Sequence, residues 1–399
     1  MKTIILLGDG MADRPVDELG GKTPLKAANT PYMDYLASRG ELGMARTVKP
    51  GFPPGSDVAN MAVMGLDPEL YYTGRAPIEA VSMGVKIEEN DMAFRANLVT
   101  LSSRENGLIM EDYSAGHIST EEASELIASL KDCIETKYRD IQLFSGIDYR
   151  HLMVMRNYEK DDIKTTPPHD IMGEFIDKYL PDDEFIRGLI HESMGVLKDH
   201  PINLRRRKQG KREGTAMWPW GQGRAMRVPT IEQEYGITGA MISAVDLMKG
   251  LGILRGMEII DVPGATGWID TNYQGKADAA LDALKRLDMV YVHVEAPDEA
   301  GHAGLLKEKI LAIENFDRLI VGNILKGMEA LNTHFRCLVL PDHPTPLELR
   351  THTPDPVPFV IYDSTDIKDS ARRFSERDAQ ETGLFIEEGY TLLKKLLGA

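Results

Sequence analysis

The stretch Val292–Gly304, with the sequence VHVEAPDEAGHAG, is the part of the chain on which the predicted fold rests. It overlaps a run of β-forming residues, Met289–Val294, and places Asp298 and His302 four residues apart. That spacing puts two side chains on one face of a helix. A carboxylate and an imidazole offered together from the end of a strand favour Mn²⁺ or Zn²⁺ over Ca²⁺, since imidazole is a poor ligand for a hard cation. The alternative is an ordinary helix start, with Asp298 near the cap and His302 on the surface.

Short apolar runs alternate with helical patterns through most of the chain. Residues 3–9 form the first predicted strand, which ends in Asp9 between Gly8 and Gly10. Further strands are predicted at residues 42–48, 257–262, 289–294, 335–340 and 357–362, and helices at residues 30–39, 238–249, 275–287 and 307–331. Strands that alternate with helices are joined by crossover connections, so we expect a mostly parallel sheet whose ligands gather beyond the carboxyl ends of the strands.

A different pattern begins at about residue 85. Residues 94–101 alternate like a half-buried strand, residues 119–130 form a capped amphipathic helix, and residues 152–155 form another strand. Residues 165–170 and 204–223 are rich in Pro, Gly, Arg and Trp and are predicted to be loops. We therefore expect two domains: a discontinuous α/β domain of residues 1–84 and 228–399, and an inserted, smaller α+β domain of residues 85–227.

Acidic residues follow three of the predicted strands. Asp9 ends the first strand, Asp298 follows residues 289–294, and Asp342 follows residues 335–340. Because the carboxyl ends of parallel strands meet at one edge of a sheet, these carboxylates are expected to lie close together. Three histidines accompany the last two of them: His302, His343 and His352. Each residue alone is compatible with a cap, a turn aspartate or a surface histidine, but their joint placement predicts a shared metal site.

Ser56 lies where a Pro/Gly-rich loop, residues 49–55, meets a predicted helix. In one interpretation it is a good N-cap residue. In the other it is a hydroxyl at the positive end of a helix, where backbone N–H groups hold an anion and a nearby metal lowers the hydroxyl pKa. The second interpretation makes Ser56 the predicted nucleophile of the site.

The charge balance and the cysteine content narrow the class of function. The 399-residue chain is 42% hydrophobic and has a formal net charge of −16, which argues against nucleic acid or an anionic membrane as its main partner. Its two cysteines, Cys133 and Cys337, indicate neither a disulfide framework nor a thiolate metal site. The apolar run at residues 4–7 is too short for a signal peptide, and no later run is long enough to span a bilayer. We therefore expect a cytoplasmic protein, and the sequence indicates no particular oligomeric state.

These residues carry a family resemblance. Gly8-Asp9-Gly10, Ser56, Asp298-x-x-x-His302, Asp342-His343 and His352 occur in the order and context of the alkaline-phosphatase superfamily. Within it, the whole chain resembles the archaeal type of cofactor-independent (2,3-bisphosphoglycerate-independent) phosphoglycerate mutases, a group whose bacterial members include proteins proposed to be homoserine kinases. The resemblance implies an alkaline-phosphatase-like three-layer α/β/α metal domain with an inserted, smaller α+β domain.

The resemblance also implies a ligand set and a reaction. One divalent metal ion would be bound by Asp9, Ser56, Asp342 and His343, and a second by Asp298, His302 and His352. Mn²⁺ is the expected metal, and Zn²⁺, Co²⁺ and Mg²⁺ are also compatible with these ligands. The implied reaction interconverts 2-phosphoglycerate and 3-phosphoglycerate through a phosphoserine at Ser56. Two alternatives keep the metal site: phosphorylation of homoserine by ATP, although the chain has no GxxxxGK[ST] loop, and the chemistry of a phosphatase or phosphopentomutase.

The inserted domain is expected to hold the substrate. The resemblance leads us to expect an arginine in the Ala115-Gly116-x-Ile118 segment, where this chain has His117. Guanidinium groups bind carboxylates and phosphates in bidentate fashion, so arginines of the insert are candidate binding residues for phosphoglycerate. The alternative for each arginine is a structural or solvent-facing charge. The candidate substrate-binding residues are Arg95, His117, Arg150, Arg156 and Arg224.

Overall fold

The structure is a computed structural model that describes residues 1–398, and the chain divides into two compact units. The first unit contains Met1–Tyr72 and the chain from Arg227 onward, and the second contains Thr73–Met226. The first crossing between the units therefore precedes the predicted one after residue 84. Helix α5 (Arg75–Ser82) accounts for the difference, because it packs against strands β3 (Met92–Arg104) and β7 (Ala216–Gly223) of the second unit.

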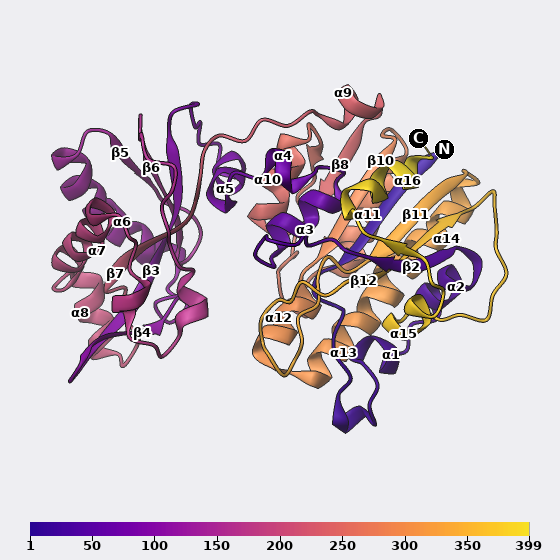
Figure 1. Cartoon of the computed structure of the whole chain (residues 1–399), viewed down its shortest axis with the longest axis horizontal. Coiled ribbons are helices and arrows are strands. Elements are labelled where there is room, and N and C mark those ends of the chain that lie inside the picture. Colours follow the sequence, from indigo (N-terminus) through magenta and orange to yellow (C-terminus); the bar gives the residue numbers. More distant parts are fainter. Residues whose placement is uncertain (399) are drawn as a thin grey trace. The chain divides into compact units, whose positions relative to one another are not determined.

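An eight-stranded sheet forms the centre of the first unit (Figure 1). In spatial order its strands are β13 (Phe385–Ile386), β2 (Glu41–Ala45), β12 (Val357–Asp363), β11 (Phe335–Leu340), β1 (Lys2–Gly8), β10 (Met289–Val294), β8 (Gly239–Ile242) and β9 (Glu258–Ile259). Strands β11, β1, β10, β8 and β9 run parallel to one another, as β13 does to β2. Strand β12 is antiparallel to both of its neighbours. The predicted α/β class is confirmed, with β12 as the exception to a parallel sheet.

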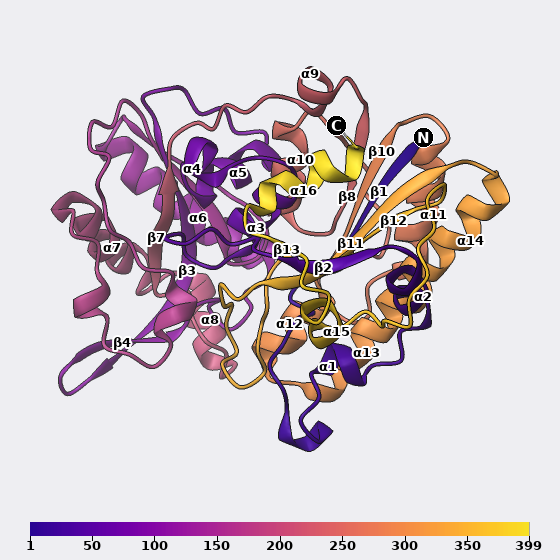
Figure 2. The same cartoon turned by 45° about the vertical axis from the view of Figure 1, so that its right-hand side comes forward.

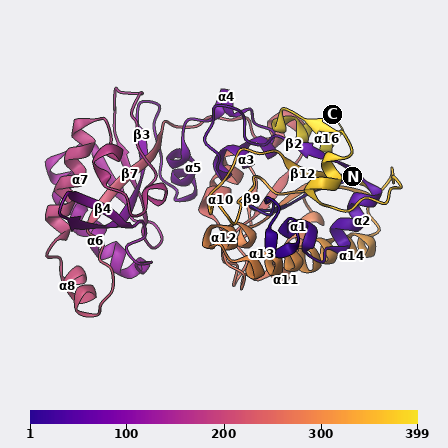
Figure 3. The same ribbon diagram turned by 60° about the horizontal axis from the view of Figure 1, so that its bottom comes forward.

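Helices cover both faces of this sheet. One face carries α2 (Pro31–Arg39), α11 (Tyr273–Leu284), α13 (Leu306–Asn315), the π-helical turn η4 (Phe316–Val321) and α14 (Gly322–Leu331). The other carries α3 (Ser56–Val63), α10 (Asp246–Leu254) and α16 (Leu392–Leu397). Figure 2 shows α16 on one side of the strands and α11 and α14 on the other, and Figure 3 shows α11, α13 and α14 side by side. The first unit therefore has the predicted three-layer α/β/α arrangement.

Shorter elements connect these layers. They are the α-helices α1 (Pro24–Ala27), α4 (Pro68–Tyr71), α9 (Ile231–Tyr235), α12 (Ala296–Ala303) and α15 (Glu376–Gln380), and the 3-10 turns η1 (Asp17–Leu19) and η5 (Gly389–Thr391). Within residues 1–398, no helix is both long and apolar enough to cross a membrane.

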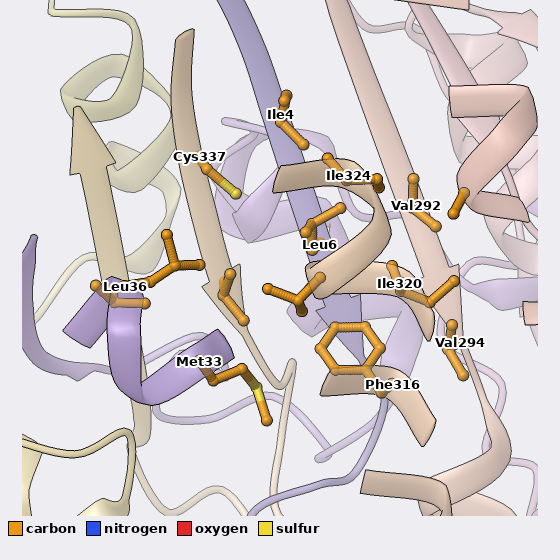
Figure 4. Close-up of a cluster of buried hydrophobic side chains, with 14 of the residues drawn as sticks. Ile4, Leu6, Met33, Leu36, Val292, Val294, Phe316, Ile320, Ile324 and Cys337 are labelled. Atoms are coloured by element: carbon orange, nitrogen blue, oxygen red, sulfur yellow. The ribbon is translucent and has the colours of Figure 1, made fainter. Parts of the chain in front are cut away.

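The central strands are apolar on both sides because helices bury both of their faces. Ile4 and Leu6 of β1 belong to the core beneath α11, η4 and α14, while the alternate residues Ile5 and Leu7 point to the opposite face. All four side chains are fully buried. Figure 4 shows Leu6 surrounded by Phe316, Ile320 and Ile324 of the helical layer. This packing fixes the position of β1, whose carboxyl end leads into Asp9.

The π-helical turn η4 also caps a helix. The Asp317 carboxylate is fully buried and accepts hydrogen bonds from the backbone N–H groups of Tyr32 (3.3 Å) and Met33 (2.6 Å). These N–H groups lie in the first turn of α2, where the helix offers no acceptor of its own. The N-cap residue Thr30 makes no side-chain cap bond within the described chain, so a distant carboxylate takes that role. Burial raises the pKa of Asp317 to about 7 despite these bonds.

The second unit is a smaller α+β structure. Its sheet has the order β4 (Gly107–Asp112), β3, β6 (Arg150–Met155) and β5 (Ile141–Phe144), and β7 pairs with β3. In Figure 1, α6 (Thr120–Lys137), α7 (Glu184–Leu197) and α8 (Pro201–Lys208) lie on one side of these strands and α5 on the other. Two 3-10 turns complete it, η2 (Pro168–Ile171) and η3 (Ile176–Tyr179).

Two local predictions are wrong. Residues 204–223 were expected to form a loop, but they contain the end of α8 and the whole of β7. Strand β7 tolerates Pro219 because it pairs only with β3 and has an open edge where the missing N–H is not needed. Residues 238–249 were expected to form a helix, but they contain β8 and the start of α10. A short buried apolar run has no periodicity that separates a strand from a helix, and pairing with β10 decides between them.

Candidate active site

The three predicted aspartates lie at one edge of the central sheet. Strand β1 pairs in parallel with β10 on one side and with β11 on the other, so the carboxyl ends of the three strands are neighbours. Asp9 follows β1, Asp342 follows β11 after a proline, and Asp298 lies in the first turn of α12, directly after β10. All three aspartates are buried.

Asp298, His302 and His352 form one cluster of candidate ligands, whose ligand atoms lie within 4.8 Å of one another. Nε2 of His302 is 3.2 Å from Oδ2 of Asp298, and Nε2 of His352 is 3.5 Å from Oδ1 of the same carboxylate. Helix α12 presents Asp298 and His302 from successive turns, in line with their spacing in the sequence. His352 comes from the loop between β11 and β12.

Asp9, Asp298 and His343 form a second cluster, again with ligand atoms within 4.8 Å of one another. Nε2 of His343 lies 3.1 Å from Oγ of Ser56 and 3.4 Å from Oδ2 of Asp342. The Ser56 Oγ is also 3.5 Å from Oδ2 of Asp9. The first unit thus brings together all of the predicted metal-site residues, and Asp298 belongs to both clusters.

Hydrogen bonds at Nδ1 orient two of the histidines. Nδ1 of His302 is 2.9 Å from the Arg350 carbonyl oxygen, which only accepts, so this nitrogen carries the proton. The Thr345 hydroxyl donates to Oδ1 of Asp298 and therefore accepts from Nδ1 of His343, 3.3 Å away. In the neutral rings, Nε2 of both histidines is then left with a lone pair directed at the carboxylates, the arrangement that a metal ligand needs.

The charges of the site also fit a cation. Burial raises the pKa of Asp9, and the nearby charges of Asp342 and Asp298 raise it further. Asp9 is only 2% exposed, and its Oδ1 has no hydrogen-bond partner among residues 1–398. A buried carboxylate oxygen without a donor is costly unless a cation balances it. The carboxylate, imidazole and hydroxyl groups gathered here therefore fit a divalent metal ion that accepts both oxygen and nitrogen ligands.

Ser56 is the first residue of α3, and Gly55 before it is the N-cap residue. The interpretation of Ser56 as an N-cap is therefore wrong. Its hydroxyl faces His343 and Asp9, and it stands at the N-terminus of an eight-residue helix, where the helix dipole favours negative charge. Participation of this hydroxyl in the chemistry, the other interpretation, stays a prediction that its position fits.

Asn60 is a site residue that sequence reasoning missed. It lies one turn after Ser56 in α3, and its side-chain amide donates to Oδ2 of Asp342 (2.8 Å) and to the Ser56 carbonyl oxygen (2.9 Å). The side-chain oxygen Oδ1 of Asn60 accepts from the Tyr291 hydroxyl at 2.6 Å. The only local signal was the four-residue spacing from Ser56, which by itself indicates a shared helix face. Asn60 therefore links α3, the helix that begins with Ser56, to the Asp342 carboxylate at the end of β11.

A group of charged and aromatic side chains lies in the second unit. Nε of Arg75 and Nη1 of Arg95 each donate to Oε1 of Glu79 at 2.8 Å. The guanidinium carbons of Arg75 and Arg95 lie 5.8 and 4.7 Å from the ring centroid of Trp220. Burial lowers the pKa of Arg95 to about 10, and its Nε has no hydrogen-bond partner in the part of the chain that the structure describes. Two guanidinium groups thus donate to the same carboxylate oxygen.

Ring contacts connect this group to two more of the predicted substrate-binding residues, His117 and Arg150. A series of ring contacts runs from Trp220 through His169, Tyr113 and Tyr149 to His117, and the centroids of successive rings are 5.3 to 6.4 Å apart. The Arg150 guanidinium carbon lies 5.1 Å from the Tyr149 ring centroid. Arg75, which was not predicted to bind substrate, lies with three residues that were: Arg95, His117 and Arg150. We name this set the arginine–aromatic face: Arg75, Arg95, His117, Tyr149, Arg150 and Trp220.

The remaining two predicted substrate-binding residues, Arg156 and Arg224, form ion pairs elsewhere in the second unit. Nη1 of Arg156 lies 2.5 Å from Oδ2 of Asp91, and its Nε donates to Gln142. Arg224 pairs with Asp161 and donates to the Tyr158 carbonyl oxygen at 2.9 Å. Both guanidinium groups therefore hold loops together, and a role for them in substrate binding stays a prediction.

Sequence comparisons give one consistent description. A profile of the family described as 2,3-bisphosphoglycerate-independent phosphoglycerate mutase matches residues 37–203. The chain is 52% identical to the protein of that name from Methanosarcina acetivorans, over all of both chains. It is 51% identical, again over all of both chains, to a probable 2,3-bisphosphoglycerate-independent phosphoglycerate mutase from Geobacter sulfurreducens.

Solved structures agree with the sequence comparisons. The PH0037 protein from Pyrococcus horikoshii has a TM-score of 0.81 at 31% identity, covering 100% of this chain and 96% of that one. A cofactor-independent phosphoglycerate mutase from Thermoplasma acidophilum has a TM-score of 0.63 at 29% identity, covering 100% and 99%. With full-length relatives that share about half of its residues, this chain belongs to the family of 2,3-bisphosphoglycerate-independent phosphoglycerate mutases.

Proposed function

We propose that this chain interconverts 2-phosphoglycerate and 3-phosphoglycerate, with Ser56 carrying the phosphoryl group between the two positions. The observation that carries the proposal is the place of the Ser56 hydroxyl, 3.1 Å from Nε2 of His343 and 3.5 Å from Oδ2 of Asp9. A hydroxyl at a helix N-terminus, surrounded by metal-ligand groups, has the features of an activated nucleophile. The mutase names of the full-length relatives support the same reaction.

Two divalent cations, with Mn²⁺ as the first candidate, complete the proposed site. Asp9, Ser56, Asp342 and His343 would hold one, and Asp298, His302 and His352 the other. The mixed oxygen and nitrogen ligands suit Mn²⁺, Zn²⁺ or Co²⁺, and Mg²⁺ remains an alternative. When bound, such ions act as Lewis acids that lower the pKa of the serine hydroxyl and offset the charge of the phosphoryl group.

The proposed reaction consists of two transfers. In the first, Oγ of Ser56 bonds to phosphorus while the bond from phosphorus to the glycerate oxygen breaks, which leaves phosphoserine and glycerate. In the second, the other hydroxyl of glycerate bonds to phosphorus and Oγ of Ser56 leaves. In the first transfer the departing glycerate oxygen takes the proton that Ser56 gives up, and in the second the accepting hydroxyl gives a proton back to Ser56, so no outside phosphoryl donor is consumed. Asn60 keeps the nucleophile in place by tying α3 to Asp342.

The arginine–aromatic face is proposed to bind the carboxylate of the glycerate. Arg75 and Arg95 already hold their guanidinium groups close together around Glu79, and Nε of the buried Arg95 has no protein acceptor among the described residues. Guanidinium groups bind carboxylates in bidentate fashion, and the adjacent rings supply an apolar wall. Retention of the glycerate is what separates a mutase from a phosphatase, because the acceptor must stay bound until it takes the phosphoryl group back.

A cytoplasmic location is part of the proposal. Both cysteines, Cys133 and Cys337, are free thiols in the described structure. Free thiols are compatible with a reducing compartment, where glycolytic phosphate esters are also found.

Isotope tracing tests the proposed reaction. The metal-loaded protein is given ³²P-labelled 3-phosphoglycerate together with unlabelled ATP, and the products are separated. A mutase moves the label into 2-phosphoglycerate, whereas Ser56→Ala should move none. Absence of isomerisation, together with ATP-dependent phosphorylation of homoserine, would replace the proposal with the kinase alternative; release of labelled inorganic phosphate alone would replace it with a phosphatase.

A further inference from the structure

A buried hydrogen-bond relay lies behind Asp9. His293, near the end of β10, is 1% exposed, and its Nε2 is 2.9 Å from Oδ2 of Asp9. Its Nδ1 is 3.1 Å from Oγ of Ser243, which is 3% exposed and follows β8. The backbone N–H of Val245 donates to the same hydroxyl oxygen at 3.0 Å. The relay therefore connects the ends of three neighbouring strands, β8, β10 and β1.

The partners determine which ring nitrogen of His293 carries the proton. With a cation bound, the Asp9 carboxylate is ionised and only accepts, so its contact with His293 then requires N–H at Nε2. Nδ1 of the neutral ring is then an acceptor, and the Ser243 hydroxyl donates to it. Ser243 Oγ remains able to accept from the Val245 N–H. Each donor in the relay thus has one acceptor, and all of them point toward Asp9.

This tautomer is the reverse of the one found at the candidate ligands. His302 and His343 carry their protons on Nδ1 and direct the lone pair of Nε2 into the site. His293 directs an N–H into the site instead, although it stands in the same short stretch as His302. A donor cannot also be a metal ligand, so His293 acts on the carboxylate beside it.

The two oxygens of Asp9 consequently have different surroundings. Oδ2 is held by His293, whereas Oδ1 has no hydrogen-bond partner among residues 1–398. We propose that His293 and Ser243 are positioning residues, which rotate the Asp9 carboxylate so that Oδ1 is presented to a divalent cation. The inference rests on the proposed metal site, but it concerns the orientation of one ligand and not the substrate.

Cation affinity tests the proposal without using turnover. Metal-free protein is titrated with Mn²⁺, and the free ion is followed by electron paramagnetic resonance. His293→Met removes the donor and should weaken Mn²⁺ binding about 10- to 100-fold, the usual effect of losing a group that orients a ligand. His293→Gln places an amide N–H where Nε2 stands and should stay within a few-fold of the wild type. Ser243→Ala should fall between them.

A control and a spectroscopic readout separate positioning from a general structural role. His151 is also buried, at 3% exposure, but it lies in the second unit, so His151→Met should leave Mn²⁺ affinity unchanged. In protein labelled with ¹⁵N-histidine, the ring signals of His293, identified by their loss in His293→Gln, should show the proton on Nε2. Ser243→Ala should shift this ring toward the other tautomer.

The outcomes are distinct. Wild-type affinity in a folded His293→Met variant would overturn the proposal, and so would an equal loss in His293→Gln and His293→Met, since that would make the imidazole itself a ligand. If His293→Met does not fold, wild-type affinity in Ser243→Ala or a proton on Nδ1 of His293 overturns it. A protein that shows the expected affinities and tautomer yet fails to isomerise phosphoglycerate would contradict the proposed function and leave the relay standing.

Discussion

Nε2 of His302 and Nε2 of His352 lie 2.8 Å apart, although the two residues are 50 positions apart in the sequence. The Arg350 carbonyl accepts from Nδ1 of His302, so whenever the ring is neutral its Nε2 faces His352 with a lone pair. Two nitrogens at this distance need a proton or a cation between them. Both also approach the carboxylate of Asp298, which attracts the same cation. A divalent cation bound between the two rings and Asp298 would satisfy all three groups.

Loss of one candidate ligand should abolish most of the activity. His302→Ala removes a ligand from the cluster with Asp298 and His352, and turnover is expected to fall by several orders of magnitude, because the positive charge that activates the nucleophile is lost with the metal. Metal content by elemental analysis and turnover are measured on the same samples. His334→Ala, at an exposed histidine of the same unit, should change neither. Full activity after exhaustive chelation would contradict a metal site.

Acid quenching should trap the phosphoryl group on Ser56. Incubation with labelled phosphoglycerate, followed by peptide mapping, is expected to place phosphate on the peptide that contains Ser56, and Ser56→Ala should trap none. Ser119 provides a matched control, because it also stands at a helix start but caps α6 through the N–H of Glu122. Ser119→Ala should trap phosphate as the wild type does. Mutase turnover that survives in Ser56→Ala would show that another group attacks.

Arginines of the arginine–aromatic face should affect isomerisation more than hydrolysis. Arg150→Gln and Arg75→Gln each remove a charged hydrogen bond to the carboxylate, which is worth about 1.5 to 3 kcal/mol, or roughly 10- to 150-fold in rate. Hydrolysis of a simple phosphate ester, which has no carboxylate to hold, should change little.

Arg156 supplies the matched comparison for these variants. Its guanidinium pairs with Asp91, and if that structural role is its only one, Arg156→Gln should lower thermal stability and leave the ratio of isomerisation to hydrolysis unchanged. An equal loss of isomerisation in the Arg150, Arg75 and Arg156 variants would show that the arginine–aromatic face has no special role in holding the substrate.

Asp317→Asn should remove part of the pH dependence of folding stability. Asp317 has a pKa of about 7 in the folded protein because it is buried, against an ordinary value of about 3.9 in an unfolded chain. The folded state therefore binds this proton more tightly than the unfolded state does. Protonation of Asp317 contributes its full amount to the free energy of unfolding below about pH 4, and this contribution is lost as the pH rises through 7. The full difference is on the order of 4 kcal/mol.

Urea unfolding of the metal-free protein between pH 4 and 8 measures this effect. The free energy of unfolding of Asp317→Asn should decline less with rising pH than that of the wild type, whatever its absolute value. Asp369→Asn, at an exposed aspartate of the same unit, should follow the wild-type profile. Parallel profiles for Asp317→Asn and the wild type would rule out an elevated pKa at this helix cap.

Local sequence patterns were enough to predict where the acidic metal-site residues lie. Asp9, Asp298 and Asp342 each follow a buried apolar run, and strands joined by crossover helices end at the same edge of a sheet, so local patterns were enough to group them. The four-residue spacing of Asp298 and His302 placed both on one face of α12. These features depend on local periodicity and on one general rule of topology, and both can be read along the chain.

The residues that support the site, in contrast, are brought to it by long-range packing. Asn60 reaches Asp342 across 282 positions, and His293 reaches Asp9 across 284. No local pattern encodes such contacts, because they depend on how separate strands and helices pack. The assignment of α5 to the second unit and the pairing of β7 with β3 were hidden for the same reason.

The two histidines of the opening stretch show the difference most directly. In the sequence, nothing distinguishes His293 from His302 as a candidate ligand, because both lie near the end of the same predicted strand. In the fold, Nδ1 of His302 meets the carbonyl of Arg350, which only accepts, whereas Nε2 of His293 meets the carboxylate of Asp9, which only accepts when it is ionised. A ring that gives its proton to an acceptor on one side has a lone pair on the other, and a ring that accepts on one side has an N–H on the other. Packing alone selects which ring nitrogen meets the acceptor, and that choice makes one histidine a candidate ligand and the other a group that orients a ligand.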